Sequence, residues 1–175
     1  MKKFILAAFV AVASLTANAQ VYLGGNVGFN SVKYGEEKGS NVFTLAPEVG
    51  YNISSKYAVG AALNLSIGNR AAGDFTDFEL MPYFRYTFAS AGPVKFFADG
   101  CLSLGTSKLE HHDAQFCWGI GINPGLSVNL AKQVSFVAHL GGIGYKQYGK
   151  GGDKVRTFGI GALCSEVSFG VFFNL

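Results

Sequence analysis

The chain has 175 residues, of which only 14% are charged and 14% are aromatic, and its formal net charge is +3. Soluble domains usually carry about 25% charged residues, so this chain is poorly equipped to cover a surface that faces water. Lys2 and Lys3 belong to the N-terminal segment discussed next. Without them, the chain has 12 basic and 11 acidic residues, so its net charge is +1. It therefore lacks the basic excess typical of nucleic-acid binding.

The first 19 residues predict a secretory signal peptide. Lys2 and Lys3 form a short basic start, Phe4–Leu15 is almost entirely apolar, and Ala17-Asn18-Ala19 offers small residues for cleavage. The alternative is a retained anchor helix, but the apolar run is shorter than the roughly 18 residues that favour one. We therefore expect residues 1–19 to be removed and residues 20–175 to form the exported domain.

Apolar residues alternate with small or polar ones along nearly all of residues 20–175. Successive side chains of a strand point to opposite faces, so each run predicts a strand with one apolar and one polar face. None of the apolar-phase positions is charged. In chain order, the sets span Val21–Phe29, Phe43–Tyr51, Tyr57–Ile67, Phe78–Phe88, Val94–Leu104, Phe116–Leu130, Val134–Leu140 and Val167–Leu175. This pattern predicts an all-β fold, an antiparallel eight-stranded up-and-down transmembrane β-barrel.

The connections between these runs alternate between short and long. Residues 54–56, 90–93 and 131–133 form tight turns, whereas residues 32–41, 68–77, 108–115 and 146–156 form longer, glycine-rich and charged loops. Outer-membrane barrels have short periplasmic turns and longer outer loops, and an even strand count would place both termini in the periplasm.

Two irregularities interrupt the alternation. Pro47, Pro82 and Pro124 fall within strands, where proline removes a ladder hydrogen bond, so we expect bulges or strand offsets there. The apolar phase also changes near residues 164–166, which predicts either a bulge or a late start of the last strand.

Alternation alone does not say which face meets lipid. A soluble, lipocalin-like barrel would turn its apolar face inward and carry a Lys/Glu-rich exterior. Here the polar face consists mostly of small residues, which suits a narrow lumen better than a solvated exterior, so we favour the membrane barrel.

The inward phase of the predicted barrel carries a few ionisable side chains. Eight strands leave a lumen just wide enough for side chains to fill, and an unpaired buried charge costs several kcal/mol. We expect these residues to form an interior polar network that plugs the lumen; the alternative is a conduction path. They are Glu48, Glu79, Arg85, Lys95, Asp99 and His139.

Two further groups are candidate sites. Cys101 and Cys117 would face each other if their hairpin were symmetric about Leu109, so a cross-strand disulfide is one hypothesis and two buried thiols the other. Glu110-His111-His112-Asp113 lies in a predicted outer loop. This outer-loop charged cluster has the residue types of a metal site or a general base, but a solvated loop tip is the simpler interpretation. We therefore predict no metal site, no catalytic residue and no cofactor.

The signal sequence ending Ala-Asn-Ala-Gln, the alternating strands and the closing Val-Ser-Phe-Gly-Val-Phe-Phe-Asn-Leu resemble the small outer-membrane β-barrel family related to the OmpA membrane domain and OmpX, a porin-family barrel. The resemblance implies an outer membrane of a Gram-negative bacterium. It also implies recognition of the C-terminal strand by the outer-membrane assembly machinery. Members typically end in an aromatic residue, whereas this chain ends in Leu175.

Three functions remain open at this level. The first is a structural or surface-interaction barrel that is not an enzyme and whose charged loops contact lipopolysaccharide phosphates or an unknown surface partner. The second is a small-solute pore, and the third is a lipid-modifying outer-membrane enzyme. The loop charges are Lys33, Glu36, Glu37, Lys38, Lys146, Lys150, Asp153, Lys154 and Arg156.

Overall fold

The computed structural model describes residues 20–32, 40–70, 73–110, 113–149, 154–160 and 167–175. The predicted signal peptide lies outside these residues, as do residues 33–39 of the first predicted loop and the expected phase change near residues 164–166. Among the described residues, no helix has the length and hydropathy needed to cross a membrane.

Ten strand segments make up the structure. They are β1 (Val21–Val32), β2 (Ser40–Asn52), β3 (Tyr57–Arg70), β4 (Gly73–Ala91), β5 (Val94–Leu109), β6 (Gln115–Asn129), β7 (Val134–His139), β8 (Ile143–Tyr148), β9 (Val155–Ile160) and β10 (Ser168–Asn174). β7 and β8 both pair with β6, and they form one barrel strand in two pieces. β9 pairs with β8 and β10 pairs with β7, which makes them the two pieces of the last barrel strand.

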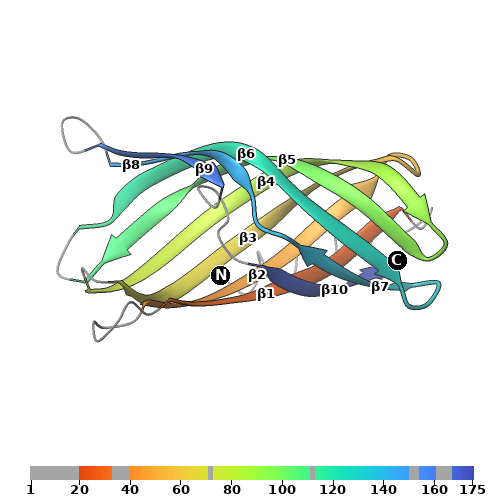
Figure 1. Cartoon of the computed structure of the whole chain (residues 1–175), viewed down its shortest axis with the longest axis horizontal. Coiled ribbons are helices and arrows are strands. Elements are labelled where there is room, and N and C mark those ends of the chain that lie inside the picture. The colour runs from red at the N-terminus through yellow and green to blue at the C-terminus, as the bar shows by residue number, and fades with distance from the viewer. Residues whose placement is uncertain (1–19, 33–39, 71–72, 111–112, 150–153, 161–166) are drawn as a thin grey trace, which may run out of the picture.

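The sheet closes on itself. β1 to β6 follow one another as antiparallel neighbours, and β10 pairs with β7 on one side and with β1 on the other. The result is a closed antiparallel eight-stranded barrel, as the alternation predicted. Figure 1 shows an elongated barrel of tilted strands, with the C-terminus at the end that carries the short turns.

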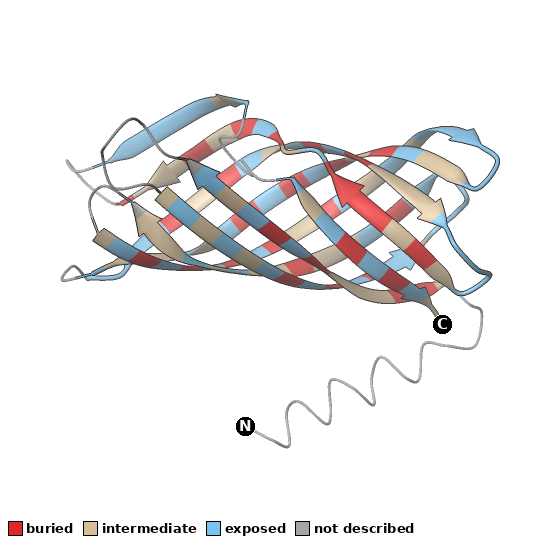
Figure 2. Cartoon of the chain, turned by 60° about the horizontal axis from the view of Figure 1, so that its bottom comes forward, coloured by how far each residue is buried: buried red, intermediate tan, exposed pale blue. Residues whose placement is uncertain are grey.

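The two faces of the wall have opposite chemistry. Figure 2 shows buried and exposed positions alternating along the strands. The exposed positions are large and apolar, such as Phe29, Ile67 and Ile122, whereas Glu48, Asp99 and other polar side chains are buried inside. A soluble protein would have the reverse arrangement, so apolar side chains that face outward indicate contact with hydrocarbon.

The strand prolines behave in two ways. At Pro47 and Pro82 the ladder is interrupted, but the register is the same on both sides. At Pro124 the register shifts by one residue where β7 gives way to β8, and the carbonyl of Pro124 accepts a hydrogen bond from the backbone N–H of Leu140 (3.0 Å). Gly141 there has a φ of 87°, which L side chains rarely adopt. The expected strand offset is thus confirmed at Pro124 alone.

A bulge in β4 was not predicted. The register between β4 and β5 shifts between Thr87 and Ala89. The turn-side end of β4 therefore pairs Ser90 with Lys95, and beyond the bulge Arg85 lies opposite Asp99. This shift brings an inward cation and an inward carboxylate onto the same level of the lumen.

Candidate functional site in the lumen

Several polar side chains inside the barrel converge on Arg85. Its Nε lies 2.7 Å from Oδ1 of Asp99 and its Nη2 lies 2.8 Å from Oδ2. The two residues therefore form a bidentate ion pair between β4 and β5. Nη2 also lies 3.4 Å from Oε1 of Glu48 on β2. From β7, Nε2 of His139 lies 3.2 Å from Oδ2 of Asp99. Four strands thus contribute to one charged layer across the lumen.

Aromatic rings surround the same guanidinium. Cζ of Arg85 lies 4.0 Å from the ring centroid of Phe97 and 5.1 Å from that of Tyr83. Tyr83 donates a hydrogen bond to Glu48, and its hydroxyl is also bonded to that of Tyr22. We call this layer the plug, and its members are Tyr22, Glu48, Tyr83, Arg85, Phe97, Asp99 and His139.

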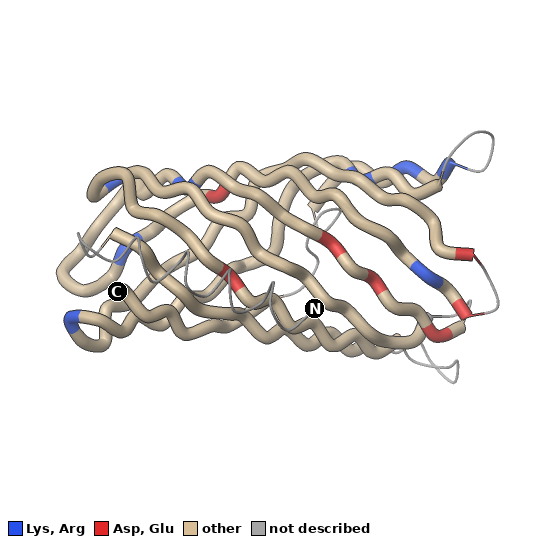
Figure 3. Tube along the Cα trace, turned by 180° about the vertical axis from the view of Figure 1, so that it is seen from behind, with Lys and Arg blue, Asp and Glu red and all other residues tan. Residues whose placement is uncertain are grey.

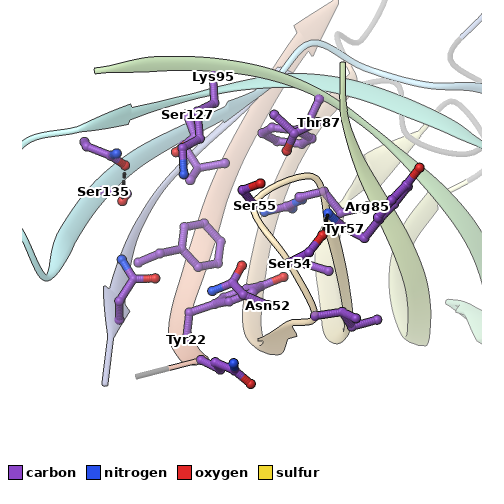
Figure 4. A pocket seen from close by; sticks show the side chains of 18 residues that line it. Tyr22, Asn52, Ser54, Ser55, Tyr57, Arg85, Thr87, Lys95, Ser127 and Ser135 are labelled. Carbon is purple, nitrogen blue, oxygen red and sulfur yellow. Dashed lines mark hydrogen bonds between the residues drawn. The ribbon is translucent and has the colours of Figure 1, made fainter. Parts of the chain in front are cut away.

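Two cavities lie on either side of the plug. The turn-side cavity, of about 390 Å³, is lined by Tyr22, Arg85 and Phe97. Figure 4 shows Tyr22 and Arg85 among the side chains around it. The loop-side cavity, of about 670 Å³, is lined by Glu48 and Asp99, with Tyr83 and His139. Among the described residues none lines both cavities, so the plug separates them.

A second charged pair lies nearer the loops. Lys146 on β8 donates to Glu79 on β4, and Ser103 on β5 donates to the other oxygen of Glu79. Nζ of Lys146 lies 5.2 Å from the ring centroid of Tyr148. All of these groups lie on the inner wall, and Lys146, Glu79 and Ser103 are buried.

The burial of Lys146 corrects the sequence analysis, which assigned this residue to an outer loop. The break at residues 140–142 changes the strand phase, so the inward positions are odd in β7 and even in β8. The sequence does contain the alternation of a strand here, because Ile143, Tyr145 and Gln147 alternate with Gly144 and Lys146. This alternation is out of phase with that of the preceding strand segment, and the segment was therefore assigned to a loop.

The six residues predicted to form one network are distributed over three places. Glu48, Arg85, Asp99 and His139 meet in the plug, and Glu79 pairs with Lys146 instead. Lys95 lines the turn-side cavity, and among the described residues it has no ion pair. Figure 3 shows how few charged positions the barrel wall carries along its length.

The two inward cysteines do not face each other. Cys101 lies opposite Gly121, and Cys117 lies opposite Gly105, so the register differs by four residues from the one that a disulfide required. Both thiols are buried, and no disulfide joins them. The disulfide hypothesis is therefore wrong, because the hairpin is not centred on Leu109.

The outer-loop cluster is only partly described. Glu110 and Asp113 are described, and the backbone N–H of Glu110 donates to the carbonyl of Asp74 (2.7 Å). His111 and His112 lie outside the described residues. Within the part of the chain that is described, no three His, Cys, Asp or Glu side chains are placed to hold a metal ion.

A family model and one solved structure agree with this architecture. A family model for the outer membrane protein β-barrel domain matches residues 4–165. No curated protein matches the chain. Neisserial surface protein A has a similar solved structure, with a TM-score of 0.60 and 20% identity over 89% of this chain and 97% of that one. Ail of Yersinia pestis aligns over 89% of this chain and 99% of its own, with a TM-score of 0.45 and 13% identity.

Proposed function

This chain belongs to the outer membrane protein β-barrel domain family, and from that premise we propose that it is a closed structural barrel that presents its loops at the cell surface. It lies in the outer membrane of a Gram-negative bacterium, surrounded by lipid. We further propose that residues 1–19 are cleaved on export and that residues 20–175 form the embedded domain. The long loops then face outward and the short turns face the periplasm.

The plug is the observation that supports a closed barrel. Its ion pairs join β2, β4, β5 and β7, and its rings fill the space around Arg85. A hydrated ion would have to displace a guanidinium that carboxylates and rings hold on several sides. Separating buried charges of this kind costs several kcal/mol, so the ground state of the barrel should not conduct.

Conductance in planar bilayers tests the proposal against a small-solute pore. The purified barrel should give no steady channel. A variant carrying both Arg85→Ser and Phe97→Ala should join the two cavities and conduct. Lys95→Ser is the matched control, because Lys95 lines the turn-side cavity without belonging to the plug. A steady open channel in the unmodified protein would refute the closed barrel.

We also propose that the protein is not an enzyme. The charged side chains of the plug form ion pairs with each other, and so do Glu79 and Lys146, which supports a structural role for them. Incubation with labelled phospholipid should therefore give no acyl transfer. Transfer that persists in the purified protein would favour a lipid-modifying enzyme instead.

The proposed partners are membrane components. On β10, Phe169, Val171 and Phe173 point outward and form the apolar face that the assembly machinery would recognise. The outer loops would contact lipopolysaccharide or a surface partner. Pull-down of the assembly machinery with a β10 peptide, compared with one in which all three residues are serine, tests the first of these contacts.

A further inference from the structure

One part of the outer wall differs from the rest. The outward side chains of β6, β8 and β9 form three rows near the loop end, which we call the loop-end patch. Strand pairing sets the rows: Trp118, Gln147 and Arg156 form the row nearest the loops, then Ile120, Tyr145 and Phe158, then Ile122, Ile143 and Ile160. Neighbouring strands are about 4.8 Å apart, so each row is about 10 Å wide.

The β9 side of the patch projects from the barrel. Phe158 is 80% exposed and Ile160 is 89% exposed, whereas Phe29, one of the more exposed apolar side chains elsewhere, reaches 65%. Among the described strands, β9 pairs with β8 alone. Figure 2 shows β9 as an exposed strand at the loop end. Two large apolar side chains thus stand clear of the wall, where a ligand can pack against them.

The β6 and β8 side of the patch is more firmly packed. The rings of Trp118 and Tyr145 are 5.4 Å apart, and the Tyr145 hydroxyl donates to Oε1 of Gln147 (3.1 Å). Tryptophan and tyrosine favour the headgroup level of a membrane. Their position therefore marks the boundary between headgroups and hydrocarbon at this end of the barrel.

Positive charge lies at that same boundary. Arg156 is exposed and is the one charged residue among the outward positions of β6, β8 and β9 in the described chain. Lys154 is exposed just before β9. An arginine fork matches the geometry of a phosphate group, and its pairing with phosphate is strengthened next to a medium of low polarity. Cations above an apolar surface complement an amphiphile with an anionic head and hydrocarbon tails.

We infer that the loop-end patch binds lipid A, the phosphorylated and multiply acylated anchor of lipopolysaccharide. The inference rests on the proposed orientation, which places this end in the outer leaflet. Arg156 and Lys154 contact the phosphates, while acyl chains lie along Phe158, Ile160 and the isoleucines of β6. Two cations beside a three-strand apolar surface suit a headgroup with more than one phosphate and several chains better than a single-phosphate lipid.

The test is native mass spectrometry of the detergent-purified barrel with three probes: diphosphorylated lipid A, enzymatically dephosphorylated lipid A and phosphatidylglycerol. The unmodified protein should retain diphosphorylated lipid A most strongly. Combining Arg156→Gln with Lys154→Gln should weaken that retention about tenfold or more. Lys132→Gln, which removes an exposed cation at the turn end, is the matched control and should change nothing. Phe158→Ser should weaken all acylated probes alike.

Equal retention of dephosphorylated lipid A, or of phosphatidylglycerol, would overturn the inference, and so would an unchanged double variant. Heat-dependent gel mobility shows beforehand that each variant is folded. Conductance separates failure of the lipid A inference from failure of the proposed function. An open channel in a protein that still selects lipid A overturns only the closed barrel. A closed barrel without lipid A selectivity overturns only the loop-end patch.

Discussion

Replacing Arg85 by methionine should destabilise the barrel strongly, because it removes the fixed cation of the plug. Asp99 would lose two hydrogen bonds of 2.7 and 2.8 Å, and Glu48 would lose its 3.4 Å contact. Both carboxylates would stay buried in the lumen. Removal of one partner from a buried pair costs about 3–5 kcal/mol. For a chain of this size, that corresponds to a loss of roughly 10 °C in melting temperature.

Heat-dependent gel mobility and urea unfolding in lipid vesicles measure this loss. Lys95→Met is the matched control, since it removes a cation from the turn-side cavity and should cost under about 1 kcal/mol. A double variant with Arg85→Met and Asp99→Leu should recover much of the stability, because both buried charges are then removed. If Arg85→Met melts no lower than Lys95→Met, the plug does not stabilise the fold and the reasoning fails.

Three other substitutions examine different parts of the barrel. Lys146→Met should lower the free energy of unfolding by about 3 kcal/mol and Glu79→Gln added to it should restore part of the loss, as measured by urea unfolding. Gly60→Ala should lower the free energy of unfolding by about 1–3 kcal/mol, because an added Cβ would lie 2.7 Å from a backbone oxygen of the neighbouring strand. The control is Gly100→Ala, where the nearest atom is 3.8 Å away, and it should be neutral in the same assay. Leu102→Arg, near the middle of β5, should cost about 2–4 kcal/mol in vesicles, and a neutral result would mean that this face does not meet hydrocarbon.

The barrel itself was predictable because its signal is redundant. Each strand repeats the same period-two pattern, and the low charge of the whole chain argues against an exterior that faces water. The break at residues 140–142 reverses the phase within one strand, but the alternation in the other strands still shows which face is apolar. The inside and outside of the wall therefore followed from composition and alternation together.

Individual pairings were not predictable, because they depend on register. The register is set by local irregularities, and a single extra residue moves a strand's side chains to the other face. The bulge between Thr87 and Ala89 aligns Arg85 with Asp99, and the break before β8 turns Lys146 inward. A symmetric-hairpin assumption failed at Cys101 for the same reason. Inward phase identified candidates for the lumen without saying which of them meet.

The positions of the lumen cations explain why only some of them need partners. Lys95 lines a cavity large enough for water, so its ammonium can remain solvated without a carboxylate. Arg85 borders the same cavity, but its guanidinium lies in the plug, with carboxylates on one side and aromatic rings on the other. The cation in the closely packed layer therefore has carboxylate partners, and Lys95 has none among the described residues. In the function proposed above, the plug closes the barrel, and the strength of its contacts decides whether the barrel stays closed.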